Sequence, residues 1–270
     1  MSEFISSFQN PLIKNLKKLN KHKERTEQNL IVIEGIRECK HAVNSGFEII
    51  KILYCSKYIS EITLKNELQI SNNFSFTEVS EEVFNTLVYR KGIKNCLAIA
   101  KPVYFSLNQV SKILNSPNPI ILVIDSVEKP GNLGAMLRTC DAANVDLIIV
   151  TDAATDLFNP NCIRASLGAV FTQKVIISSI SECINFLESQ DINVYLTYLE
   201  ASNIYFKNDF TRATAIVVGS EAIGINNEWL NHNFNRIIIP QYGKVDSMNV
   251  SNSAAVVLFE AVRQRTFSNV

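Results

Sequence analysis

The chain has 270 residues, of which 47% are hydrophobic, so it is long enough for two domains that each bury a core. Lysine plus arginine and aspartate plus glutamate both number 26, so the formal net charge is zero and no global field attracts the protein to nucleic acid. Any basic surface must therefore be local.

Cysteine and histidine spacing excludes the common metal sites. The six cysteines form no CxxC pair, and the three histidines are scattered along the chain. We expect reduced cysteines that pack as small core residues, because the N-terminus lacks the apolar core of a signal peptide. No apolar run approaches the roughly 20 residues that span a bilayer. The sequence therefore predicts a cytoplasmic protein with no metal and no membrane association.

The first thirty residues are the most basic part of the chain. The apolar residues Leu12, Ile13, Leu16 and Leu19 have the spacing of one helical face. The same segment carries the basic residues Lys14, Lys17, Lys18, Lys21, Lys23 and Arg25, which we expect on a solvated face. Both an ordinary soluble surface and a patch that contacts phosphates fit this pattern, and the sequence does not decide between them.

Alternating apolar runs and helical patterns then indicate a small α/β domain. Strands are expected at residues 30–35, 49–54, 74–79 and 96–103, with helices between them. The following segment, 104–119, is rich in serine, asparagine and proline and indicates a helix flanked by linkers. We therefore expect a first domain over residues 1–106, a linker over 107–118 and a second domain over 119–270.

The second half also alternates strands with helices, which predicts a mostly parallel sheet and an α/β fold. Apolar runs indicate strands at residues 120–124, 147–150, 175–177, 194–198, 215–218 and 236–239. Asn132 is expected to cap the helix after the first of these strands, and a last helix is expected from Ser253. Trp229 is expected to anchor the core or an interface.

Glycines and polar side chains gather after three of these strands. The stretches are NLGAMLR from Asn132, GSEAIG from Gly219 and QYGKVDSMNVSN from Gln241. Open α/β sheets bind ligands at the carboxyl ends of their strands, so we expect a ligand site there. A glycine turn such as GSEAIG brings backbone groups close to a flat polar ligand such as adenosine.

Other classes of site are excluded because their motifs are absent from the sequence. GSEAIG is not GxGxxG, the Walker glycine loop is absent, and no GxSxG has a convincing histidine partner. One arginine, one glutamate and several amides and hydroxyls remain beside the strand ends. Such a set can orient and polarise, which suits direct transfer of an already activated group to a substrate hydroxyl.

Taken together, the stretches resemble the SpoU-type, or TrmH-like, branch of the SPOUT RNA methyltransferases. NLGAMLRTCDA from Asn132 resembles the family's first motif, VVGSEAIG from Val217 its second, and IIIPQYGKVDSMNVSNSAAVVLFE from Ile237 its third. RASLGAVF from Arg164 resembles a stretch between the first two. The resemblance covers residues 120–265, and the N-terminal domain more loosely resembles the ribosomal-protein-like (L30e-like) RNA-binding domain.

The resemblance implies S-adenosylmethionine as methyl donor, held in a deep trefoil knot, and a homodimer with the site near the subunit interface. By position, the residues implied to bind the donor are Gly219, Glu221, Gly224, Ile239 and Met248. The implied catalytic and acceptor-side group is Asn132, Arg138, Glu221, Ser247 and Asn249. Our hypothesis for Arg138 is that its guanidinium, fixed by Asn132 and Glu221, stabilises a developing alkoxide, because arginine is a poor general base.

The sequence departs from the family pattern at a few positions. Met248 replaces the usual leucine, and Ala222 and Ile223 replace a more polar pair, which leaves the conformation of that turn open. The resulting prediction is methyl transfer to a ribose 2′-hydroxyl of structured RNA, with ribosomal RNA as the expected partner. A transfer-RNA substrate, and a non-catalytic RNA-binding or ribosome-assembly protein that keeps the fold, remain alternatives.

Overall fold

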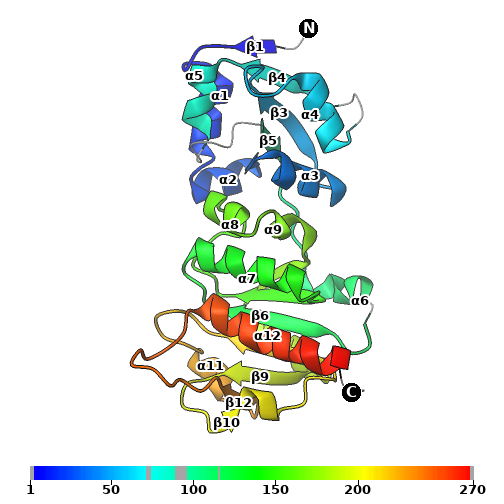
Figure 1. Cartoon of the computed structure of the whole chain (residues 1–270), viewed down its shortest axis with the longest axis vertical. Helices are drawn as coiled ribbons and strands as arrows, with labels where there is room; N and C mark the ends of the chain where they lie inside the picture. Colours follow the sequence, from blue (N-terminus) through cyan, green and yellow to red (C-terminus); the bar gives the residue numbers. More distant parts are fainter. Residues whose placement is uncertain (1–2, 71–73, 89–95, 115, 268–270) are drawn as a thin grey trace. The chain divides into compact units, whose positions relative to one another are not determined.

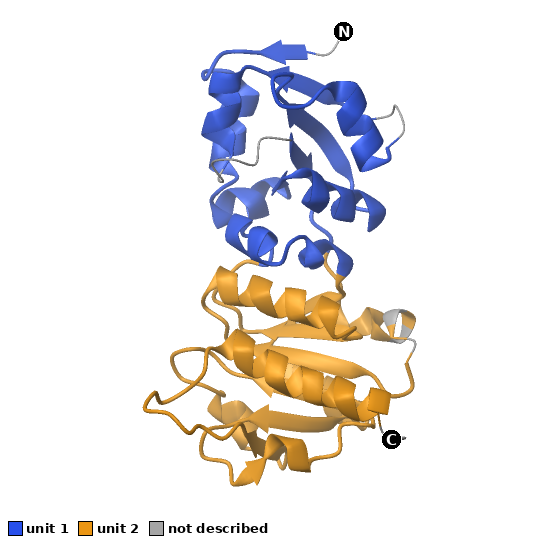
Figure 2. Cartoon of the chain, viewed as in Figure 1, with its two compact units in different colours: residues 1–103, 157–172 blue, residues 104–156, 173–270 orange. Residues whose placement is uncertain are grey.

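The computed structural model describes residues 3–70, 74–88, 96–114 and 116–267. They form two compact units (Figure 2): residues 1–103 with 157–172, and residues 104–156 with 173–270. Both units are α/β. The sequence-based division assigned 157–172 to the second domain, because this segment lies between two strands of that domain. The structure groups its two short helices with the first unit instead.

The first unit is built on a five-stranded sheet of order β1-β4-β3-β5-β2. Its strands are β1 (Glu3–Ile5), β2 (Ile31–Glu34), β3 (Ile49–Tyr54), β4 (Phe76–Val79) and β5 (Cys96–Ala100). Its helices are α1 (Pro11–Lys18), α2 (His22–Gln28), α3 (Ile36–Asn44), α4 (Glu61–Leu68), α5 (Glu81–Leu87), α8 (Pro160–Ala165) and α9 (Ala169–Thr172). Strands β1, β4 and β3 are parallel, whereas β5 runs antiparallel to both of its neighbours.

Aromatic packing joins the segment 157–172 to the rest of this unit. The ring of Phe47 makes edge contacts with Phe158 and Phe171, at centroid distances of 6.0 and 5.1 Å. Asn159 caps α8 by accepting a hydrogen bond from the backbone N–H of Asn161 at 2.9 Å. Helices α8 and α9 contact β2 and α3. A buried aromatic cluster therefore holds the segment in the first unit.

In the basic N-terminal segment, one residue that was expected to be exposed is buried. Ile13, Leu16 and Leu19 are buried as the helical spacing predicts. Arg25 was expected on the solvated basic face, but it is only 5% exposed and its Nη1 donates to the carbonyl of Leu19 at 2.7 Å. The prediction for Arg25 was wrong because its guanidinium satisfies a backbone carbonyl at the turn between α1 and α2.

The second unit has a seven-stranded sheet of order β10-β12-β9-β11-β6-β7-β8, with every pair parallel. The strands are β6 (Ile120–Asp125), β7 (Leu147–Thr151), β8 (Val175–Ser178), β9 (Asn193–Thr197), β10 (Asn203–Ile204), β11 (Thr214–Val218) and β12 (Asn235–Ile238). The helical elements are η1 (Leu107–Gln109), α6 (Val110–Ile113), α7 (Pro130–Ala142), α10 (Ile180–Ser189), η2 (Tyr205–Lys207), α11 (Asn227–Leu230) and α12 (Val250–Phe267). The predicted parallel α/β sheet is confirmed.

Helices cover both faces of this sheet. Figure 1 shows α7 and α12 side by side in front of the strands, and the two helices are in contact. On the other face, Cys183 and Leu187 of α10 and Trp229 of α11 belong to one core cluster with residues such as Val123 and Val217 of the sheet. Trp229 is fully buried there, which confirms its predicted role as an anchor. The strand ends are thus held on a rigid scaffold.

The order and register of the strands do not decide whether the chain threads through a loop, so the deep trefoil knot stays a prediction. Within the described residues, no helix is both long enough and apolar enough to cross a bilayer. The same residues contain no group of three or more histidine, cysteine or acidic side chains placed to hold a metal ion. All six cysteines are buried free thiols.

Trp229→Ala should lower the free energy of unfolding of the second unit by about 3–5 kcal/mol, because it empties a fully buried site. Urea denaturation followed by circular dichroism measures this change. Tyr242→Ala serves as the control, since Tyr242 is 95% exposed and its replacement should change the midpoint very little. Equal effects of the two substitutions would contradict the burial of Trp229.

Candidate active site

A cavity of about 560 Å³ lies at the carboxyl ends of β9, β11 and β12, entirely within the second unit. This volume suits a small-molecule ligand. All five residues expected to bind the methyl donor line it: Gly219, Glu221, Gly224, Ile239 and Met248. Ser247 and Asn249 of the expected catalytic group line it as well. The expectation that ligand chemistry gathers at these strand ends therefore matches one cavity.

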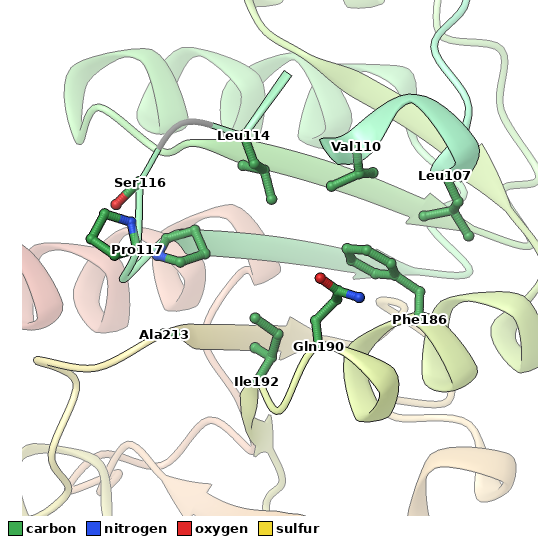
Figure 3. A pocket seen from close by; sticks show the side chains of 10 residues that line it. Leu107, Val110, Leu114, Ser116, Pro117, Phe186, Gln190, Ile192 and Ala213 are labelled. Carbon is green, nitrogen blue, oxygen red and sulfur yellow. The ribbon is translucent and has the colours of Figure 1, made fainter. Parts of the chain in front are cut away.

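A second hollow, of about 410 Å³, lies at the amino ends of the strands. Figure 3 shows that mainly apolar side chains line it, with Ser116 and Gln190 as the polar exceptions. The apolar part comes from Leu107, Val110, Leu114, Pro117, Pro119, Phe186, Ile192 and Ala213. This hollow lacks the convergent polar groups that a catalytic site needs, so the cavity at the carboxyl ends is the candidate.

The turn after β11 is closed by its own backbone. Ser220 and Gly224 exchange two backbone hydrogen bonds, at 2.9 and 3.1 Å, and the Ser220 hydroxyl accepts a third from the N–H of Ile223 at 3.2 Å. Gly224 has φ +71°, a region that favours glycine. A Cβ on Gly219 would lie 2.1 Å from the carbonyl carbon of Gly224, so any side chain at Gly219 would force the backbone of this turn to shift. These contacts define the turn at Ala222 and Ile223 that the sequence left open.

A buried carboxylate fixes the exit of this turn. Asp125, at the end of β6, is fully buried, and its Oδ2 accepts the backbone N–H of Asn226 at 3.1 Å. Its Oδ1 accepts the hydroxyls of Ser126 and Thr151 at 3.0 and 3.1 Å. Burial raises the pKa of the Asp125 carboxyl above its ordinary value, against the opposing effect of these hydrogen bonds. Asp125 thereby ties the turn to the centre of the sheet.

Side-chain hydrogen bonds connect the three motifs at the cavity. Asn132 Nδ2 donates to Glu221 Oε1 at 2.5 Å, and Asn249 Nδ2 donates to Asn132 Oδ1 at 3.2 Å. The backbone N–H of Glu128 donates to the other oxygen of Glu221 at 3.4 Å. Asn132 does not cap α7 as expected, because the helix begins at Pro130 with Lys129 as its N-cap. Its position in the first turn of α7 instead directs its amide toward Glu221.

Asn249 has a second role at the start of α12. Its Oδ1 accepts the backbone N–H of Ser251 at 2.9 Å and the hydroxyl of Ser251 at 2.6 Å. The helix consequently begins at Val250, three residues before the expected start at Ser253. Capping occupies the oxygen of the Asn249 amide and fixes its plane, so the NH₂ group is turned toward Asn132.

Glu221 is held in its charged form. Partial burial alone would raise the pKa of Glu221, but the hydrogen bonds from Asn132 and from the backbone, together with the nearby charge of Lys129, outweigh it. The pKa of Glu221 therefore lies below its ordinary value. An ionised carboxylate at the cavity rim is an acceptor for a cation or a hydroxyl.

The structure does not bring Arg138 to this group. Arg138 is exposed on α7, and it forms no hydrogen bond or ion pair with any residue that the structure describes. It lies six residues after Asn132, which places it about 120° around the helix axis from that side chain. The expected contact of its guanidinium with Asn132 and Glu221 is thus not formed within one chain. Ser247 is exposed at the cavity, in the loop before α12.

Sequence reasoning missed the part of the cavity that follows β9. Tyr198 and Glu200 line it, with the Tyr198 hydroxyl donating to Glu200 Oε2 at 2.9 Å. Lys129 also lines it. No motif marks the segment after β9, and only the strand order, which places β9 between β11 and β12, puts it beside the glycine turn.

Comparison with known proteins assigns the chain to a family. The model of the SpoU rRNA Methylase family matches residues 119–259, and that of the MRM3-like substrate binding domain matches residues 10–98. The 23S rRNA (guanosine(2553)-2′-O)-methyltransferase RlmP of Bacillus subtilis is 28% identical over 259 residues, covering 94% of this chain and 97% of that protein. The chain therefore belongs to the SpoU rRNA methylase family, as the sequence motifs predicted.

Solved structures agree with this assignment over nearly the whole chain. A crystal structure of an RNA 2′-O ribose methyltransferase has a TM-score of 0.82 and 33% identity, covering 98% of this chain and 100% of that one. The AdoMet-bound rRNA methyltransferase from Sinorhizobium meliloti has a TM-score of 0.87 and 26% identity, covering 98% of each chain. The predicted enzyme class, a SpoU-type RNA methyltransferase with an N-terminal substrate-binding domain, is confirmed.

Asn249→Ala should lower the free energy of unfolding by about 1 kcal/mol, because it removes the cap of α12. Asn249→Ser is the matched control: serine can cap the helix but lacks the amide that reaches Asn132. We expect it to stay within a few tenths of a kcal/mol of the wild type in urea denaturation. A loss in the serine variant as large as that in the alanine variant would contradict the capping role.

Asn132→Ala should make stability depend differently on pH. The depressed pKa of Glu221 contributes stability that is present above its unfolded value and is lost as pH falls through its folded value. The melting-temperature gap between wild type and Asn132→Ala should therefore be largest near neutral pH and shrink in acid. In a Glu221→Gln background the gap should no longer vary with pH. A gap that varies equally in both backgrounds would refute the assigned hydrogen bond.

Proposed function

We propose that this protein transfers the methyl group of S-adenosylmethionine to a ribose 2′-hydroxyl of ribosomal RNA. The observation that carries the proposal is the hydrogen-bonded group Asn249, Asn132 and Glu221 at the rim of a cavity built from glycine turns. The names of the family and of relatives such as RlmP support ribosomal RNA as the substrate class.

The residues at the cavity fit the proposed donor. Gly219 and Gly224 line the cavity without side chains, and a Cβ on Gly219 would lie only 2.1 Å from the Gly224 backbone. The cavity wall is therefore bare backbone here, and a flat adenosine can bind close to it. Ile239 and Met248 add apolar and backbone contacts from the next strand end. When bound, S-adenosylmethionine supplies a methyl group activated by its sulfonium charge.

The chain's own residues would orient the acceptor. The amide of Asn249 is fixed by its capping bond, and the carboxylate of Glu221 is fixed by Asn132, so both present a defined geometry to a ribose. Ser247, exposed at the cavity, can hydrogen-bond the same ribose. A guanidinium from Arg138 would stabilise the developing alkoxide and a neighbouring phosphate.

We propose that Arg138 reaches the site from the partner subunit of a homodimer, because it does not reach the site of its own chain. Helix α12 carries an apolar stripe that is only partly buried: Ala255, Val256 and Val262 are half-buried, and Phe259 is exposed. Phe259 is 47% exposed, and α12 contacts α7, which bears Arg138. An isologous interface over α7 and α12 would bury this stripe and bring Arg138 beside the partner's cavity.

The direct test is incubation with labelled donor and separate unmodified ribosomal and transfer RNAs, followed by mapping of the product by mass spectrometry. Label on a ribose of ribosomal RNA supports the proposal, and label on transfer RNA alone would reassign the substrate. A protein that binds RNA but transfers no methyl group would support a non-catalytic role in ribosome assembly.

We also propose a cytoplasmic location, which the free thiols of all six cysteines suit.

Mixing two inactive variants should restore activity if the site is shared between subunits. In a heterodimer of Arg138→Ala with Asn249→Ala, one site combines the intact Arg138 of one chain with the intact Asn249 of the other. Random exchange of subunits should therefore recover about a quarter of the wild-type sites. If Arg138 acts on its own chain's site, every mixed site carries one substitution and no activity returns. Methyl transfer per mole of protein measures the outcome.

A further inference from the structure

Helix α1 presents a concentrated basic face in a chain of zero net charge. Lys14, Lys17 and Lys18 lie on α1, and Lys21 follows it; all four are exposed. Helix α1 contains no acidic residue, and none of these lysines forms an ion pair with a described residue. Other lysines of this unit are paired instead, as Lys23 with Glu27, Lys65 with Glu61 and Lys101 with Glu48. The four lysines therefore keep their charges free of direct ion pairs with the described residues.

The basic face has a fixed orientation. Ile13 and Leu16 are buried in the core cluster of the first unit, and Asn10 caps the helix by accepting the N–H of Leu12 at 2.9 Å. The lysines must consequently point away from the core. Because the apolar stripe of α1 is already buried, the helix has no apolar face left to insert into a membrane.

An aromatic ring stands beside these lysines. Phe8, in the turn between β1 and α1, is 45% exposed, and the Nζ of Lys17 lies 5.7 Å from its ring centroid. A half-exposed ring beside a cation is a suitable platform for a nucleobase. Proteins recognise unpaired RNA bases by stacking them on aromatic rings next to cations that hold the phosphates.

We propose that Phe8 and the lysines Lys14, Lys17, Lys18 and Lys21, together the α1 face, dock an RNA element that has an unpaired base beside a helix. The inference rests on the proposed function, since the docked RNA would be the substrate whose ribose is methylated. The lysines would contact consecutive phosphates, because Lys14 and Lys18 are one helical turn, about 6 Å, apart along α1. Phe8 would stack on the unpaired base.

The first test compares two triple variants of the full-length protein with the same change in net charge. Lys14→Gln/Lys17→Gln/Lys18→Gln removes three unpaired charges of the α1 face, and Lys23→Gln/Lys65→Gln/Lys101→Gln removes three paired ones. Binding to a ribosomal RNA fragment is measured over a range of salt concentrations. The slope of log K against log salt should fall by about 2 in the first variant and stay near wild type in the second.

Activity and donor binding separate docking from catalysis. The first triple variant should raise KM for RNA at least about tenfold at physiological salt, while kcat and the calorimetric Kd for S-adenosylmethionine remain unchanged. Equal salt slopes and equal KM values for the two triple variants would overturn the proposal. Competition by polyglutamate as strong as by RNA of equal charge would also overturn it and assign the surface to an acidic protein.

Phe8→Leu tests the aromatic part. Its affinity for RNA with an unpaired base should fall about tenfold, whereas its affinity for a fully paired duplex and its salt slope should not change. An equal loss on both RNAs would contradict stacking. If wild-type protein transfers no methyl group but keeps the steep salt slope of the α1 face, the proposed function fails and the docking surface stands. If methyl transfer proceeds and the triple variant keeps its KM, only the docking surface fails.

Discussion

The candidate site depends on one set of hydrogen bonds, through which Asn132 joins Glu221 to Asn249. Each of these residues comes from a different motif, and the three motifs follow β6, β11 and β12. Because the strands are parallel, their carboxyl ends meet at one edge of the sheet. The set keeps Glu221 ionised, and the cap of α12 fixes the orientation of Asn249. A rigid polar rim results, and positioning and electrostatics are the contributions such a rim can make to methyl transfer.

Below this rim, buried structure supports the turn that forms the cavity wall. Asp125 accepts hydrogen bonds from β7 and from the exit of the glycine turn, and Trp229 anchors α11 directly after that turn. Keeping a carboxylate fully buried is costly unless donors surround it, and here three donors do so. The closed turn at Gly219 and Gly224 is thus held from beneath as well as by its own backbone.

The sequence predicted the second unit closely where local patterns determine structure. Apolar runs ended by glycine, proline or polar residues marked each of its longer strands, and the motifs identified residues that line the cavity at the strand ends. The position of Tyr198 and Glu200 depended on strand order, which no local pattern encodes. The burial of Arg25 depended on a single carbonyl at a turn. The separation of Arg138 from Asn132 follows from helix geometry. The proposed homodimer would instead bring Arg138 to the site of the partner subunit.

Calorimetric titration of the wild-type protein and of Gly219→Ala with S-adenosylmethionine tests directly whether the donor binds in this cavity. We expect saturable binding to the wild type. We expect no binding to the folded Gly219→Ala variant, because the added methyl group would overlap the Gly224 backbone and displace the cavity wall. Unchanged affinity in the variant, with circular dichroism showing an intact fold, would mean that the donor does not bind at the carboxyl ends of β9, β11 and β12.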